Sequence, residues 1–299
     1  MWLLDTSKYT LTQTLYPEKY AILSHTWEDG EVTFQDIKDP AVASQKAGWV
    51  KIVQTCRLAK GQGFDRVWID TCCIDKSSSA ELSEAINSMF QWYKNADVCY
   101  VWLSDLPRAP DGPNSQASQN QLERDLPRCR WFTRGWTLQE LIAPRNIKFY
   151  DRGWVMRGTK LTLVAQLADI TNIAFLLLYN MSELYEYPVA RRMSWAAKRQ
   201  TTRLEDAAYC LLGIFEVNMP MIYGEGERAF QRLQEAIALS SNDMSLFAWS
   251  GGPGAAMPFH GIIARSPSQF AQCTKIVNNY EPLHYDSRSF AITNRGVEF

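Results

Sequence analysis

The sequence Tyr20-Ala-Ile-Leu-Ser24 decides the fold of this chain. It is a short apolar run of the kind found in parallel strands that are buried on both faces. A polar segment with His25, Thr26 and Trp27 follows it. Three later runs have the same character, at residues 66–70, 98–103 and 147–150. These four runs predict the strands of one sheet.

The intervals between the four runs all exceed the dozen residues that a parallel crossover needs, and helical patterns fill them. We therefore expect an α/β fold with a doubly wound parallel sheet and a helical C-terminal extension. The predicted parts are an α/β core at residues 1–155, a helical extension packed on it at 156–240, and short strands and loops at 241–299. Because no clear terminal element precedes Phe299, we expect a longer parent protein.

Two local patterns add detail to this expectation. Residues 109–120 are rich in Pro, Gly, Ser, Asn and Gln and have no large apolar side chain, which predicts a mobile surface insertion. Residues 78–81 and 202–205 both match the capping box that begins a helix. Residues 245–249 and 289–293 are predicted to form short strands.

Composition excludes several classes of protein. With 299 residues and 46% hydrophobic content the chain can bury a large core, and a net charge of -1 gives no general attraction to nucleic acid. Seven cysteines without a CxxC pair, and no signal peptide, favour a reducing, cytoplasmic location. No apolar run approaches the ~18 residues of a membrane helix, since the longest covers only residues 173–179.

Candidate site residues lie where the predicted strands end, because ligands of open parallel sheets bind beyond the carboxyl ends of the strands. These residues are Ser24, His25, Trp27 and Asp70, with Glu140 on the short helix within residues 130–144. Each has a structural alternative. His25 could bond a backbone carbonyl, Asp70 could cap a turn, Trp27 could cover the core, and Glu140 could pair with Arg134 or Arg145 at the surface.

Other chemistries fit the sequence poorly. His25, His260 and His284 are scattered and Cys72 is adjacent to Cys73, whereas zinc ligands come in spaced pairs, so no metal is expected. There is no GxSxG motif for a hydrolase, although His25 could serve Cys72 or Cys73 as a base. The glycine loop at residues 223–228 lacks the Gly-Lys-Ser/Thr of a phosphate loop, which favours a helix entry or an interdomain turn.

Three ordered motifs resemble the fungal heterokaryon-incompatibility (HET) domain. They are Ala21-Ile-Leu-Ser-His-Thr-Trp27, Val67-Trp-Ile-Asp-Thr-Cys-Cys-Ile-Asp75 and Phe132-Thr-Arg-Gly-Trp-Thr-Leu-Gln-Glu140. The resemblance continues to about residue 240 and is to proteins of the vegetative-incompatibility type. It implies a cell-death effector that acts after nonself recognition.

The same segments are more distantly similar to TIR domains, which implies a TIR-like, flavodoxin-like sheet. Gly135-Trp-Thr-Leu-Gln-Glu-Leu141 resembles the TIR helix whose glutamate is essential for NAD cleavage, although Thr137 stands where many TIR domains have cysteine. The resemblance thus implies an NAD glycohydrolase with Glu140 as its catalytic residue and NAD as substrate, without a cofactor.

The resemblance also suggests roles for the other candidates. Trp27 or Trp136 would hold the cationic nicotinamide by stacking, and Asp70 would hold ribose hydroxyls. Ser24, His25 and Arg134 would contact polar ends of the dinucleotide.

Expected partners are NAD or a related dinucleotide, further copies of the chain in an active homo-oligomer, and fused or recruited signalling domains. The alternative is a non-enzymatic, self-associating module that triggers death by recruitment.

Overall fold

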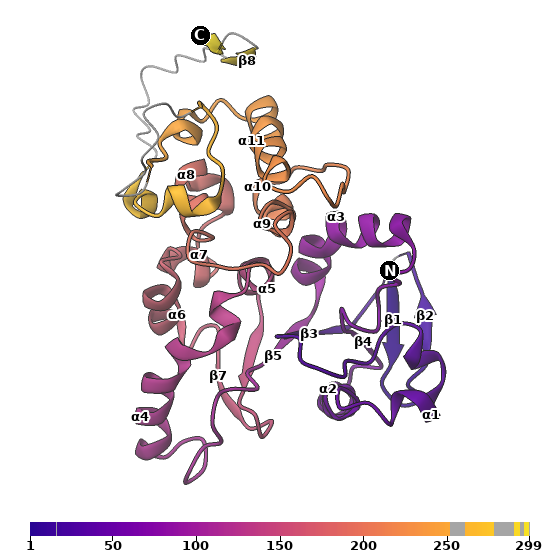
Figure 1. Ribbon diagram of the computed structural model, residues 1–299. Helices are drawn as coiled ribbons and strands as arrows, with labels where there is room; N and C mark the ends of the chain where they lie inside the picture. The colour runs from indigo at the N-terminus through magenta and orange to yellow at the C-terminus, as the bar shows by residue number, and fades with distance from the viewer. Residues whose placement is uncertain (16, 252–260, 278–289, 294–295, 299) are drawn as a thin grey trace. The chain divides into compact units, whose positions relative to one another are not determined.

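A computed structural model describes residues 1–15, 17–251, 261–277, 290–293 and 296–298 (Figure 1). The chain forms two compact units. The first comprises residues 1–132 and 140–170, and the second comprises residues 133–139 and 171–299. The division predicted at residues 155 and 240 stays a prediction, because compactness alone does not define an independently folding domain.

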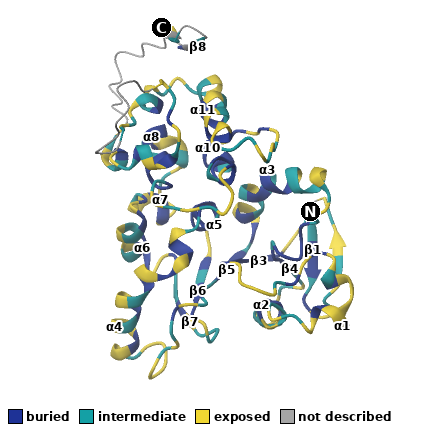
Figure 2. Cartoon of the chain, viewed as in Figure 1, coloured by how far each residue is buried: buried dark blue, intermediate teal, exposed yellow. Residues whose placement is uncertain are grey.

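The first unit is built on a seven-stranded mixed sheet in the order β2-β1-β4-β3-β5-β6-β7. The four predicted strands are its centre and are parallel to one another. Their bounds are β3 Ala21–His25, β4 Arg66–Trp68, β5 Val98–Trp102 and β6 Ile147–Tyr150. The central strands β3 and β5 are buried along almost their whole length, as Figure 2 shows.

The expectation of an entirely parallel sheet is wrong at both edges. The strands β1 (Trp2–Asp5), β2 (Leu11–Gln13) and β7 (Met156–Thr159) are antiparallel to their neighbours. They have only three or four residues and are partly exposed, so they lack the buried apolar run that identifies the central strands. The α/β class itself is confirmed.

The α-helices that lie wholly or partly in the first unit occupy the intervals between strands or adjoin them. They are α1 Pro40–Ala43, α2 Trp49–Gly61, α3 Ser79–Asn95, α4 Gln116–Asp125, α5 Thr137–Ile142 and α6 Val164–Thr171. The capping box that begins α3 is confirmed in part, because the Ser78 side chain accepts a hydrogen bond from the Glu81 amide. The division between the two units falls within α5, after Gln139, and again at the end of α6.

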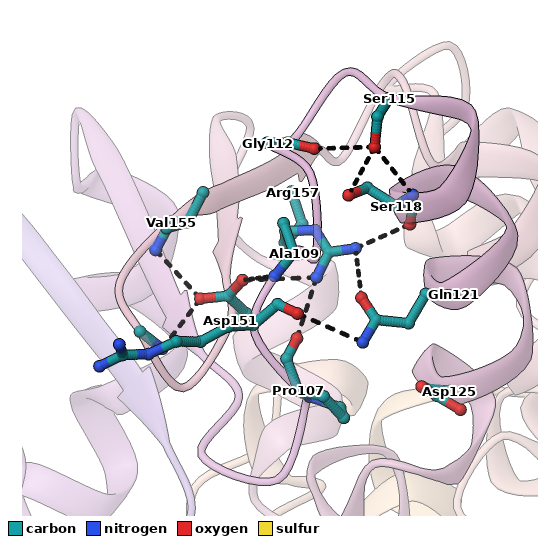
Figure 3. A network of polar contacts seen from close by, with 12 residues as sticks. Pro107, Ala109, Gly112, Ser115, Ser118, Gln121, Asp125, Asp151, Val155 and Arg157 are labelled. Carbon is teal, nitrogen blue, oxygen red and sulfur yellow. Dashed lines mark hydrogen bonds and ion pairs between the residues drawn. The ribbon is translucent and has the colours of Figure 1, made fainter.

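In the segment 109–120, which the sequence predicts to be a mobile insertion, residues 116–120 instead form the first half of helix α4 (Figure 3). Ser115 caps α4 by accepting from the Ser118 amide, and the guanidinium of Arg157 donates to the Ser118 carbonyl at 2.8 Å. The same guanidinium pairs with the buried carboxylate of Asp151 at 3.4 Å. The anchor comes from a residue far along the chain, which local composition cannot indicate.

Where the structure describes it, the second unit consists mostly of short helices. Its α-helices after α6 are α7 Phe175–Leu178, α8 Val189–Ser194, α9 Asp206–Tyr209, α10 Leu212–Phe215 and α11 Arg228–Ser240. The helix α11 packs against α9 and buries Phe230, Leu233 and Ile237. A small hairpin of β8 (Ala291–Thr293) and β9 (Gly296–Glu298) lies near the end of the chain.

Three sequence predictions for this unit have mixed outcomes. The capping box at residues 202–205 is wrong, since α9 begins after Glu205, which accepts from the Gly224 and Gly226 amides instead. Residues 244–247 form a 3-10 helix rather than a strand. The strand predicted at 289–293 is found at Ala291–Thr293, and Ser289 lies outside the described residues.

No helix within the described part of the chain is both long enough and apolar enough to cross a membrane.

Replacing Arg157 with methionine should lower the free energy of unfolding by about 3–5 kcal/mol, because Asp151 would remain as a buried charge without its partner. Arg124→Met is the matched control. Its pair with Asp125 is mostly exposed on the arginine side, so the loss should be much smaller than for Arg157→Met. Urea unfolding measures both values, and similar losses in the two variants would contradict the anchoring role of Arg157.

Candidate functional site at the carboxyl ends of the central strands

Glu140 is buried and bonded to the end of β3. Only 6% of Glu140 is exposed, and its Oε2 accepts a short hydrogen bond from the hydroxyl of Ser24, which is fully buried. The indole N–H of Trp131, on the 3-10 helix Arg130–Thr133, donates to the same Ser24 oxygen at 2.7 Å. The alternative of a surface ion pair for Glu140 is therefore wrong, since the carboxylate does not lie at the surface.

The charge of Glu140 changes the pKa of two other buried groups on this face of the sheet. The pKa of Tyr93, on α3, is raised well above its usual value, first by burial and then by the charge of Glu140. Burial followed by the same charge also raises the pKa of the Cys99 thiol on β5. The Tyr93 hydroxyl donates to the Leu23 carbonyl at 2.9 Å, which ties α3 to β3 beside the site.

His25 belongs to a second cluster on the opposite face of the sheet. Consecutive residues of a strand point to opposite faces, so His25 turns away from the Ser24 side. Its Nε2 lies 3.7 Å from Asp70 Oδ1 and 3.8 Å from Glu31 Oε1. Glu31 is in turn held by the ammonium of Lys51 on α2. The predicted site residues of the first unit thus form two neighbouring clusters rather than one.

The imidazole of His25 is neutral at physiological pH. Burial lowers its pKa well below the usual 6.5, and the charges of Lys51 and Lys76 lower it further. Neither ring nitrogen has a hydrogen-bond partner among the described residues, which contradicts the alternative that His25 bonds a backbone carbonyl.

Several other buried polar atoms near the strand ends also lack a hydrogen-bond partner within the described residues. They are Asp70 Oδ1, Thr71 Oγ1 and Ser104 Oγ. Native proteins satisfy most buried polar atoms, so this edge of the sheet has donors and acceptors available for water or a ligand.

Trp27 is the most exposed of the predicted residues in this unit, at 48%. Its indole N–H donates to Asp70 Oδ2 at 2.6 Å, and the ammonium of Lys76 lies 3.5 Å from the centre of its ring. Asp70 therefore fixes the indole, rather than capping the following turn alone. The ring already binds one cation, which is the interaction predicted for it with nicotinamide.

Arg134 and Trp136 belong to the second unit by the division of the chain. Arg134 donates to the Thr202 hydroxyl at 3.1 Å, and Trp136 hydrogen-bonds to Asp206. Both side chains thus have partners within their own unit.

Sequence reasoning missed four residues that build the site, namely Trp131, Glu31, Lys51 and Lys160. The buried ammonium of Lys160 donates to the carbonyls of Ile142 and Pro144, at the C-terminal end of the helix that carries Glu140. A cation at this end of a helix is favourable because the unpaired carbonyls lie there. A lone lysine after a strand gives no sequence signal for this contact.

The geometry does not support a metal site, a cysteine nucleophile or a phosphate loop. Among the described residues no three His, Cys, Asp or Glu side chains are grouped so as to hold a metal ion, and His260 and His284 lie outside those residues. A hydrogen bond with Cys73, together with burial, raises the pKa of the Cys72 thiol well above its usual value, which disfavours a thiolate nucleophile. The glycine loop leads into α11, as a helix entry does.

Comparison with known proteins identifies related sequences. The family model described as "Heterokaryon incompatibility protein (HET)" matches residues 20–112. The vegetative incompatibility protein HET-E-1 of Podospora anserina is 47% identical over 224 residues, which is 73% of this chain. The chain spans only 16% of the length of that relative. No solved structure matches the chain. Ser24, His25, Trp27 and Asp70 lie within the family match, whereas Trp131 and Glu140 lie beyond it.

The buried Lys160 should make stability depend on alkaline pH. Burial lowers its pKa from 10.5 to about 8, so between these values the folded protein has released a proton that the unfolded chain still holds. Unfolding then takes up a proton, and stability rises with pH through this window by up to roughly 3 kcal/mol from this one group.

Urea unfolding at pH 7.5 and pH 10 measures this contribution. Because other groups also titrate in this range, the comparison is between the parent protein and Lys160→Met, which should lack the gain. Lys94→Met, at an exposed position of α3, should behave like the parent. A Lys160→Met protein with the same pH dependence as the parent would disprove the assignment.

Proposed function

We propose that this chain, whose residues 20–112 match the heterokaryon-incompatibility (HET) family model, acts in vegetative incompatibility as a cell-death effector that cleaves NAD at the nicotinamide–ribose bond. Glu140 is the catalytic residue in this proposal. The observation that carries it is the buried carboxylate of Glu140, which is hydrogen-bonded to Ser24 at the carboxyl end of β3.

The position of this carboxylate in the sheet supports the proposal. In open α/β sheets, ligands bind beyond the carboxyl ends of the strands at the point where the strand order reverses. Along this chain the connection from β3 leads to β4 on one side, and the connection from β4 returns to β5 on the other side of β3. The reversal therefore lies between β3 and β5, and Ser24 is the next-to-last residue of β3.

The TIR-like part of the proposal rests on the same topology. Numbered along the chain, the four parallel strands have the spatial order 2-1-3-4. This is the order of the first four strands in flavodoxin-like sheets. The antiparallel strands at both edges and the second unit are additions to that plan.

The chemistry asked of Glu140 is electrostatic. Water and NAD react to give ADP-ribose, nicotinamide and a proton. The bond between the ribose carbon and the nicotinamide nitrogen breaks with its electron pair going to nicotinamide, and positive charge develops on the ribose. A carboxylate next to that carbon stabilises the charge, and a water molecule then supplies the new oxygen.

The other candidates would bind the substrate. Asp70 Oδ1 and the neutral His25 present unpartnered polar atoms that fit ribose hydroxyls, and the exposed ring of Trp27 fits the cationic nicotinamide. Ser24 acts on Glu140 rather than on a polar end of the dinucleotide. Roles for Arg134 and Trp136 toward the substrate remain part of the proposal.

Homo-oligomerisation, partner signalling domains and a cytoplasmic location complete the proposal. Homo-oligomerisation rests on the resemblance to TIR enzymes, whose sites are completed between neighbouring subunits, and the partner domains rest on the greater length of the relative. The cytoplasmic location rests on the seven cysteines without a CxxC pair.

A non-enzymatic signalling module is the second candidate. It is favoured by a group of exposed apolar side chains on the second unit, at Phe175, Leu176, Tyr179, Met181 and Tyr185. Exposed apolar patches of this kind are typical of surfaces that bind another protein. Such a module would act by self-association and recruitment, with Glu140 as a structural acid.

Purified protein at high concentration should release nicotinamide from NAD, and Glu140→Gln should lower the rate at least about 100-fold, because the amide keeps the shape of the side chain but removes its charge. Chromatography of nicotinamide measures the rate. Glu123→Gln, at an exposed position of α4, is the matched control and should retain full activity.

Sedimentation of the same samples establishes whether the protein is assembled. Absence of nicotinamide release by an assembled protein would disprove the enzymatic proposal. Full killing of cells by the Glu140→Gln protein would instead support the signalling module.

A further inference from the structure

We propose that Trp131 is a positioning residue, which directs the hydroxyl proton of Ser24 onto Glu140 and so holds Glu140 in its charged form. The catalytic consequence rests on the function proposed above. The geometric claim does not, because it concerns three side chains that are in contact in the folded protein.

The direction of the two hydrogen bonds follows from the chemistry of the groups. An indole nitrogen can only donate, so the contact of 2.7 Å between Trp131 Nε1 and Ser24 Oγ must have the serine oxygen as acceptor. The serine hydroxyl has one proton, and its other contact is with Glu140 Oε2. The proton of Ser24 is therefore directed at the carboxylate.

Packing keeps this arrangement in place. Ser24 is fully buried and Trp131 is 1% exposed, so bulk water does not compete for either hydrogen bond. The indole of Trp131 meets Phe132 and Phe149 edge to face, with ring centres 5.0 and 5.9 Å away. These contacts fix the plane of the ring and hence the direction of its N–H bond.

A donor that is held on a carboxylate oxygen favours the charged form of the acid. This form is the one needed beside a ribose that develops positive charge, since a neutral acid would give little stabilisation. A serine without the indole could rotate its hydroxyl toward other acceptors. Trp131 removes that freedom and makes Ser24 a permanent donor to Glu140.

The simpler interpretation is that Trp131 only fills the core. Packing against Phe132 and Phe149 explains an aromatic ring at this position, but it does not require a hydrogen-bond donor. Substitution by phenylalanine keeps much of the ring and removes the N–H, so it separates the two interpretations.

The experiment compares the parent protein with Trp131→Phe, Ser24→Ala and the double variant. Carbon-13 NMR follows the titration of the Glu140 side-chain carboxyl, identified by its absence in Glu140→Gln. Ser24→Ala should move the midpoint up by about one pH unit, the size expected for loss of a hydrogen bond to a charged group. Trp131→Phe should move it in the same direction by less.

In the double variant the midpoint should equal that of Ser24→Ala, because Trp131 acts through Ser24. Where NAD is cleaved, the acidic limb of the kcat profile should move by the same amount, and Ser24→Thr, which keeps a hydroxyl, should restore it. Trp102→Phe is the control. Its indole N–H has no partner among the described residues, and it pairs with His25 and so lies on the opposite face of the sheet.

An unchanged midpoint in Trp131→Phe, or additive shifts in the double variant, would overturn the proposal. A shifted midpoint in a protein that does not cleave NAD would refute the proposed function alone and support the positioning role. A similar shift in Trp102→Phe would show that any lost indole perturbs the site, and would also overturn the proposal.

Discussion

The need to satisfy one buried carboxylate organises the centre of this protein. Glu140 lies in the interior, where an unpaired charge would cost several kcal/mol, and the Ser24 hydroxyl near the end of β3 is one of the groups that stabilise it. The two residues are separated by 116 positions, and Trp131 joins the same network from the segment between β5 and α5. The crossover that carries the acid is thereby bound to the strand where the sheet order reverses.

The alternation of side chains along a strand gives the two faces of the sheet different properties. On the Ser24 face, the groups around Glu140 are buried and hydrogen-bonded, since Trp131 donates to Ser24 and the Tyr93 hydroxyl donates to the Leu23 carbonyl. On the His25 face, the imidazole and Asp70 Oδ1 have no hydrogen-bond partner among the described residues. One face is therefore suited to hold a charge in place, and the other offers polar atoms to a ligand.

Two buried cations fix helices that lie earlier in the chain and whose positions the local sequence does not predict. Lys160 binds the carbonyls at the end of α5, and Arg157 binds the Ser118 carbonyl of α4 while pairing with Asp151. In both cases a residue on or directly after β7 fixes a helix that precedes it in the chain. The edge strand β7, which no apolar run predicted, thus supports the catalytic candidate and the α4 segment alike.

The sequence by itself determined the four central strands, the α/β class, the family resemblance and the first-unit candidates at the strand ends, because buried apolar runs and short motifs are local signals. It did not determine the edge strands, the helix α4 or the partners of Glu140. Those depend on contacts between residues far apart in the chain, such as Ser24 with Trp131. The alternation of side chains along a strand already requires Ser24 and His25 to face opposite sides. Only the tertiary structure decided that the Ser24 side receives the acid of Glu140, since that outcome depends on which helices cover each face of the sheet.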